Sequence, residues 1–156
     1  VVGEESLIRA VKDGQDKEAR WNMMMASTEG AMAFTKGLGA VHSMSHAIGA
    51  NQELRLHHGT LNGVILPTVI RFNKDHVGDK LPRILRAMGK SESADLADEI
   101  EKFNEKINLP SGLKEMGVTE EMIPELVEHS ITDPSNVTTP RLPSPEEWEQ
   151  LFLSAM

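Results

Sequence analysis

Histidine is the residue type in this chain best suited to catalysis or metal binding, and it is unevenly distributed. Four of the six histidines lie within residues 37–59, which read GLGAVHSMSHAIGANQELRLHHG. His42 and His46 are four residues apart, so on a helix they lie on the same face. Two imidazoles at this spacing can point at one small object, such as a metal ion or a substrate beside a metal. Taken alone, such a pair is more often packed in a core and hydrogen-bonded to backbone carbonyls.

A second pair, His57 and His58, precedes Gly59 and opens the next expected helix. Adjacent side chains point in different directions, so we expect at most one of these two imidazoles to serve a given metal. A helix N-terminus disfavours a protonated imidazole, and a metal binds the neutral form. The alternative is that both rings are exposed to solvent and cap the helix.

The composition excludes several other chemistries. There is no cysteine, which excludes disulfides, thiolate catalysis and iron–sulfur clusters. The net charge of −8, with no basic run, argues against nucleic acid as a partner. No apolar run approaches the roughly 20 residues needed to span a membrane, and the N-terminal VVGEESL lacks the features of a signal peptide. We therefore expect a cytoplasmic protein that binds neither nucleic acid nor membrane.

Apolar residues recur with the period of a helix along the whole chain, and no useful stretch alternates as a strand does. The 156 residues suit one domain. With two Trp, four Phe and no Tyr, its core must be largely aliphatic. We predict an all-α fold, an irregular helical bundle that forms a single domain over residues 1–156. The predicted helices span 6–13, 17–34, 40–50, 58–72, 79–88, 93–107, 111–116, 120–130 and a last segment after the capping box 144–147, with a linker or crossing loop over 133–143.

Two other conspicuous patterns receive structural interpretations. The run Met23-Met24-Met25 is predicted to fill the core at a helix interface, because Met adapts to irregular gaps. The glycines of GLGA at 37–40 do not form a dinucleotide-binding fingerprint. That fingerprint requires a glycine at the sixth position and a preceding strand, whereas His42 stands at that position and a helix precedes it.

Taken together, the histidine segment and its flanks resemble the C-terminal helical domain of the iron-containing (group III) alcohol dehydrogenases. The stretch MMMASTEGAMAF looks like that family's helix before the histidine motif, and TTPRLPSPEEWEQLFLSAM looks like its C-terminal end, with Thr139 where Asn is more usual. The family pattern G-x-x-H-x-x-x-H-x-x-G, then H-G and a helix containing proline, is matched by Gly39, His42, His46, Gly49, His58, Gly59 and Pro67.

The resemblance implies a fold of the dehydroquinate synthase-like type and a specific chemistry. Members of the family join an NAD(P)-binding α/β domain to a helical domain, in which one Asp and three His hold iron or sometimes zinc. His42 and His58 would be two of those ligands, and His46 would be a catalytic residue beside the metal that handles a proton. The metal would polarise the oxygen of a small alcohol or aldehyde during hydride transfer. His57 remains an alternative ligand to His58, although Gly59 favours His58.

The resemblance also implies that the chain is a fragment. No histidine precedes His42 and no D-x-x-x-H occurs in residues 1–41, so the family's Asp and first His ligands and its NAD(P)-binding domain have no counterpart. We expect the isolated chain to be inactive, to bind metal weakly or not at all, and to form a homo-oligomer through apolar surface left uncovered. The alternative is a non-catalytic helical scaffold with incidental histidines. In that case the side chains of His42, His46 and His58 would diverge.

Overall fold

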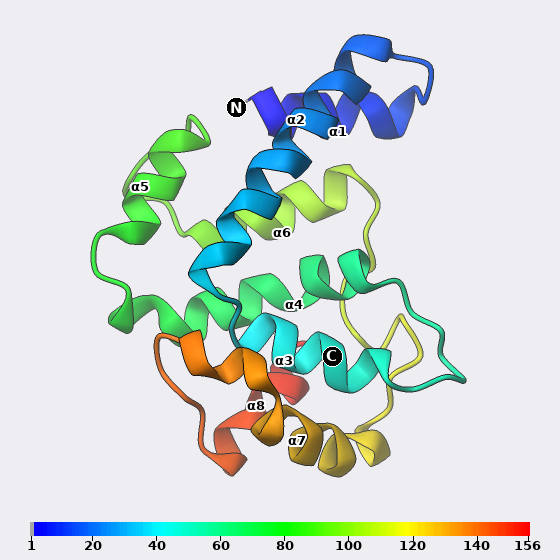
Figure 1. The fold of residues 1–156 in the computed structure, drawn as a ribbon, viewed down its shortest axis with the longest axis vertical. Coiled ribbons are helices and arrows are strands. Elements are labelled where there is room, and N and C mark those ends of the chain that lie inside the picture. The colour runs from blue at the N-terminus through cyan, green and yellow to red at the C-terminus, as the bar shows by residue number, and fades with distance from the viewer. Residues whose placement is uncertain (1) are drawn as a thin grey trace.

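The computed structural model describes residues 2–156, and over that range it contains eight α-helices and no strand (Figure 1). The prediction of an all-α fold is confirmed. None of the described helices is long and apolar enough to cross a membrane. The helices are α1 (Val2–Lys12), α2 (Lys17–Ala33), α3 (Ala40–Gly49), α4 (His58–Asn73), α5 (Lys80–Ala87), α6 (Leu96–Lys106), α7 (Ile123–Thr132) and α8 (Pro145–Ser154).

Side-chain caps fix where several helices begin. The Asp16 carboxylate accepts a hydrogen bond from the backbone N–H of Ala19 at the start of α2, and Asp95 does the same for Ala97 and Asp98 in α6. At α8, Ser144 and Glu147 form the reciprocal capping box expected from the sequence. These caps satisfy backbone donors that the first turn of a helix leaves without partners.

The hydrophobic core lies between α3, α4, α7 and α8, and α3 packs against both α4 and α7. Helix α3 is rich in small residues, so its neighbours approach its backbone closely on two sides. The core is mostly aliphatic, as the composition predicts, with one large aromatic contribution from α8. Its fully buried members include Met44, Ile48, Leu61, Ile65, Leu113, Trp148 and Phe152.

The predicted helix over 111–116 is wrong, because this segment pairs with the C-terminus instead. Residues 111–117 form turns. The backbone N–H of Leu113 donates to the carbonyl of Ala155 at 2.8 Å, and that of Lys114 donates to the carbonyl of Met156 at 3.3 Å. Gly117 then reverses the chain with φ of +89°, a left-handed conformation that favours glycine.

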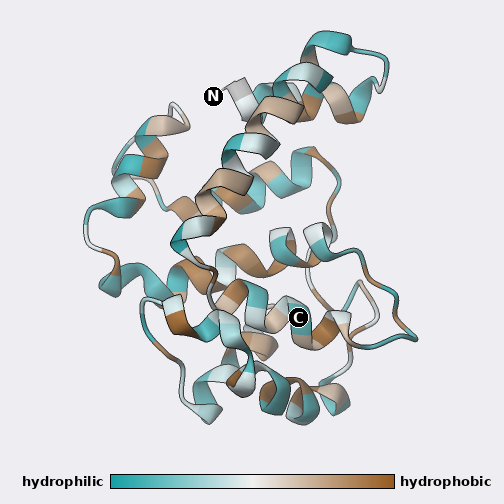
Figure 2. Ribbon diagram, in the orientation of Figure 1, coloured by the Kyte–Doolittle hydropathy of each residue, from teal (hydrophilic) through white to brown (hydrophobic). Residues whose placement is uncertain are grey.

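The prediction that Met23–Met25 fill the core is also wrong. Within α2, Ala19 is the one buried residue, and Met24 is 63% exposed. Helix α2 packs mainly along α1 and extends away from the four-helix core (Figure 1), and Figure 2 shows apolar residues along it outside that core. We call the exposed Trp21, Met24, Met25 and Met32 the α2 stripe.

We expect the α2 stripe to make the isolated chain self-associate, because a contiguous exposed apolar surface is covered when two molecules meet. The double substitution Trp21→Gln and Met24→Gln should lower the sedimentation coefficient measured at high protein concentration. Val137→Gln is the matched control, because Val137 is 88% exposed outside the stripe. A wild-type chain that sediments as a monomer at all concentrations would contradict the expectation.

The contact between the 111–117 turns and the C-terminus predicts a stability effect at Gly112. A Cβ atom at Gly112 would press against the carbonyl oxygen of Met156 and lie 2.7 Å from its carbonyl carbon. Gly112→Ala should therefore lower the free energy of unfolding by about 1–3 kcal/mol in urea denaturation. Gly30→Ala adds the same methyl group where nothing lies within 4 Å. In that helix interior it should raise stability by roughly 0.5–1 kcal/mol.

Candidate metal and catalytic site

Three of the four clustered histidines come together beside the core. The ring centroids of His42 and His46 lie 5.7 Å apart, and the ring of His58 lies 5.3 Å from the first and 5.4 Å from the second. His42 and His46 share one face of α3, and His58 is the first residue of α4. The packing of α3 against α4 therefore produces the convergence that the scaffold alternative does not expect.

His57 occupies a different environment from His58. Its Nδ1 accepts a hydrogen bond from the backbone N–H of Thr60 at 3.4 Å, so this ring caps the N-terminus of α4. The helix-cap interpretation thus describes His57, whereas His58 joins the histidine cluster.

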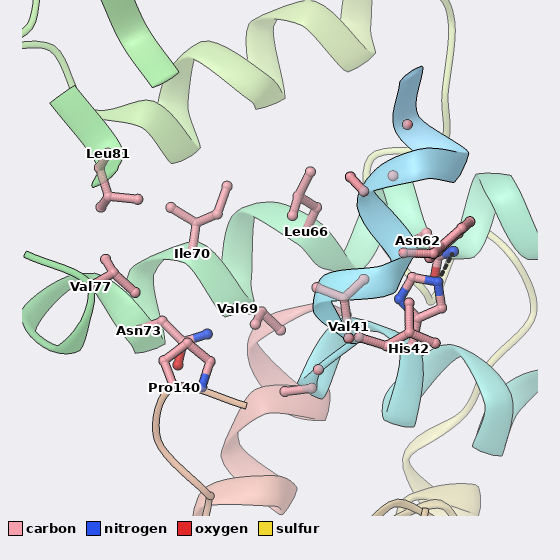
Figure 3. Close-up of a pocket in the computed structure, with 18 residues that line it drawn as sticks. Val41, His42, Asn62, Leu66, Val69, Ile70, Asn73, Val77, Leu81 and Pro140 are labelled. Atoms are coloured by element: carbon pink, nitrogen blue, oxygen red, sulfur yellow. Dashed lines mark hydrogen bonds between the residues drawn. The ribbon is translucent and has the colours of Figure 1, made fainter. Parts of the chain in front are cut away.

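Asn62 joins two of the clustered rings, and sequence reasoning missed it. Its Nδ2 donates to Nε2 of His58 at 3.0 Å and lies 3.4 Å from Nε2 of His42 (Figure 3). An amide nitrogen is a donor, so each Nε2 facing it acts as an acceptor through its lone pair. Asn62 follows His58 by four residues on α4, and this spacing was the available signal.

The chemistry of these donors fits part of a metal site. Two imidazole lone pairs, from His42 and His58, converge on one position, and neutral imidazole suits iron and zinc. The pKa of His42 lies below its ordinary value because of burial and because charges on His58 and His46 would repel a proton. Over residues 2–156, no three His, Asp or Glu side chains are arranged to hold a metal ion together. The described residues therefore fit half of a four-ligand shell.

His46 is held by Asp133, a second residue that sequence reasoning missed. Nδ1 of His46 lies 2.9 Å from Oδ2 of Asp133, which stands 87 residues further along the chain. Burial alone would raise the pKa of Asp133, but hydrogen bonds from Ser135 and His46 hold it below the usual range. No local spacing could reveal this contact.

The segment 133–138 carries Asp133 and contains a 3₁₀ helix, Pro134–Thr138. Of the two possibilities predicted for this stretch, the crossing loop is the one observed. The Ser43 hydroxyl donates to Oδ1 of Asn136 at 2.7 Å, and Nδ2 of Asn136 donates to the carbonyl of Ser130 at 2.7 Å. These bonds tie the segment to α3 and to the end of α7.

A largely apolar cavity of about 520 Å³ opens beside His42. The Phe34 ring meets the His42 ring edge-on, with centroids 5.9 Å apart. Figure 3 shows Leu66, Ile70 and Asn73 of α4 in succession along the cavity, with His42 at one end. Oδ1 of Asn62 borders it and is buried without a hydrogen-bond partner among the described residues. The apolar lining of the cavity includes Leu38, Leu66, Val69, Ile70, Val77 and Leu81.

The role of Asn136 predicts a stability effect. Asn136→Ala would remove the 2.7 Å hydrogen bonds that Asn136 makes with the hydroxyl of buried Ser43 and the carbonyl of Ser130, and would leave these groups only longer contacts of 3.4 Å and 3.3 Å. Loss of a buried partner of this kind costs about 1–3 kcal/mol in the free energy of unfolding. Val137→Ala, in the same segment at an 88% exposed side chain, should change stability by less than about 0.5 kcal/mol. Equal urea midpoints for the two variants would contradict this account.

Comparison with known proteins identifies the family of the chain. The family model of the Fe-containing alcohol dehydrogenase family, C-terminal, matches residues 2–156. The chain is 42% identical to 4-hydroxybutyrate dehydrogenase of Cupriavidus necator over 155 residues, which is 95% of this chain and 41% of the relative. It is 34% identical to NAD-dependent methanol dehydrogenase of Bacillus methanolicus over 161 residues, 97% of this chain and 42% of the relative.

A solved structure shares the fold as well. The crystal structure of 1,3-propanediol oxidoreductase superposes with a TM-score of 0.88 at 29% identity, covering 99% of this chain and 44% of that one. The chain thus spans about two fifths of the length of these relatives. By the match over 2–156 and the shared all-helical fold, it belongs to the C-terminal domain of the Fe-containing alcohol dehydrogenase family.

Proposed function

We propose that this chain supplies the metal-binding and proton-handling part of an NAD(P)-dependent alcohol dehydrogenase. The observation that supports it most is the convergence of Nε2 of His42 and Nε2 of His58 on one atom, Nδ2 of Asn62. The function of a scaffold protein does not require the Nε2 lone pairs of two histidines to point at one position. His42 and His58 are the metal ligands in this proposal, and His46 is the catalytic residue beside them.

Each residue of the site has a separate role in this proposal. When bound, the divalent metal, iron or zinc, supplies a Lewis acid for the alcohol or carbonyl oxygen, and the nicotinamide accepts or delivers hydride. His42 and His58 keep Nε2 unprotonated for the metal. His46 takes up or returns the proton of the hydroxyl group. The apolar wall around Phe34 and Leu66 excludes water from the reacting carbon.

The substrate is a small alcohol or the corresponding aldehyde. The names of the relatives include 4-hydroxybutyrate, methanol and 1,3-propanediol, which are all short hydroxyl compounds. The cavity of about 520 Å³ is mostly apolar, with the polar side chains of His42 and Asn62 at one end and that of Asn73 away from them. That arrangement suits a short carbon chain whose oxygen lies at the histidines.

The proposal requires parts that this chain does not contain. A nucleotide-binding domain and the remaining metal ligands would come from elsewhere in a longer protein, which we propose is cytoplasmic and homo-oligomeric. The relatives are more than twice as long as the segment matched here. For the isolated chain we propose weak metal binding and no turnover.

Zinc titration of the isolated chain tests the ligand assignment. Structural zinc sites with four ligands are worth about 10–16 kcal/mol. Two imidazoles should give a Kd of roughly 1 µM or weaker by calorimetry. His58→Ala should abolish the binding isotherm because one of the two lone pairs is lost. His57→Ala is the matched control and should leave the Kd unchanged. Loss of binding in His57→Ala but not in His58→Ala would reverse the assignment.

The activity itself is tested on the natural polypeptide that contains this chain. We expect it to reduce NAD⁺ or NADP⁺ with short primary alcohols, and to lose that activity on dialysis against a chelator and in the His58→Ala variant. Turnover that survives both treatments would rule out the proposed role of the metal.

A further inference from the structure

We propose that Asp133 is a positioning residue for His46, fixing the proton of that imidazole on Nδ1 so that Nε2 is the nitrogen that exchanges protons at the site. The tautomer is inferred from the contact between Nδ1 of His46 and Oδ2 of Asp133. Its consequence for catalysis rests on the function proposed above.

The two oxygens of Asp133 have separate partners. Oδ1 accepts from the backbone N–H of Ser135 at 2.8 Å, and Oδ2 lies 2.9 Å from Nδ1 of His46. An ionised carboxylate has no proton to donate, so the proton in the second contact belongs to Nδ1. The side chain of Asp133 is 13% exposed, compared with 41% for His46. The better-buried Asp133 carboxylate therefore orients the more accessible His46 ring.

The support for the carboxylate is rigid. Asp133 ends α7, and the residues after it are bonded to α3 through the Ser43–Asn136 contact. The hydroxyl of Thr138 also donates to the carbonyl of Leu38, just before α3 begins. Asp133 and His46 thus sit on elements that are joined by hydrogen bonds on both sides of the contact.

The tautomer has a direct chemical consequence. In the neutral ring with its proton on Nδ1, Nε2 of His46 carries the lone pair, so it can accept a proton from a hydroxyl group and later return it. The same division occurs in carboxylate–histidine pairs of hydrolases, where an Asn in place of the Asp leaves the geometry intact but gives the wrong tautomer. His42 and His58 already present Nε2 lone pairs.

Asp133→Asn separates the positioning role from the structural one. The Oδ1 of the new amide can keep the hydrogen bond from Ser135, while its NH₂ group faces Nδ1 of His46 as a donor. That contact requires a lone pair on Nδ1, which moves the ring proton to Nε2. We expect ¹⁵N NMR of the histidine-labelled chain to show His46 protonated on Nδ1 in the wild type and on Nε2 in Asp133→Asn.

The wild-type spectrum alone can overturn the proposal. It would do so if the His46 signal, identified as the one lost in His46→Gln, showed protonation on Nε2 or an even division between the two tautomers. An unchanged tautomer in Asp133→Asn would mean that Asp133 serves as a cap for 134–138 and nothing more. Val137→Ala is the control in the same segment and should leave the His46 signals as they are.

Turnover by the natural polypeptide gives a second, separable measurement. General acid–base groups contribute about 10²–10⁴-fold to rate, so Asp133→Asn should lower kcat by a factor in that range while zinc affinity stays the same. If the wild-type polypeptide has no alcohol dehydrogenase activity, the proposed function fails. The NMR result then still decides whether Asp133 sets the tautomer of His46.

Discussion

The close packing of α3 between α4 and α7 is the constraint on which the site depends. Ala40, Ser43 and Ala47 are small enough for both neighbouring helices to approach the α3 backbone, and all three are buried. Helix α4 then brings His58 and Asn62 to the histidine face of α3, and the end of α7 brings Asp133. Larger residues at these three positions would separate the elements and with them the imidazoles, even though His42 and His46 would keep their spacing on α3.

The core and the histidine cluster are distinct, and this affects how metal binding relates to folding. Met44, Ile48, Leu61 and Ile65 are buried away from the cluster, so the chain has a hydrophobic reason to fold without a metal. In small zinc domains the binding energy is largely folding energy. Here the protein arranges two lone pairs in advance through Asn62. A metal ligated by His42 and His58 would take the place of both hydrogen bonds from the Asn62 amide.

Local sequence patterns predicted the helices and half of the site, while long-range contacts decided the rest. The i, i+4 spacing fixed the relation of His42 to His46, because it depends on one helix alone. Asp133 could not be found in this way, since 87 residues separate it from His46. The Met24 prediction failed for a related reason: periodicity identifies an apolar face but not whether a partner covers it. Leu113 was misassigned because its backbone pairs with Ala155 at the far end of the chain.

Each clustered ring is held by a side chain outside its own helical turn. Asn62 of α4 contacts His42 across the helix interface, and Asp133 reaches His46 from the end of α7. Asn62 and Asp133 impose opposite proton requirements at different ring atoms: the amide donates to Nε2, and the carboxylate accepts from Nδ1. Both contacts agree with a proton on Nδ1 of the ring concerned. Contacts between helices therefore fix which ring nitrogens of the cluster face a donor and which face an acceptor.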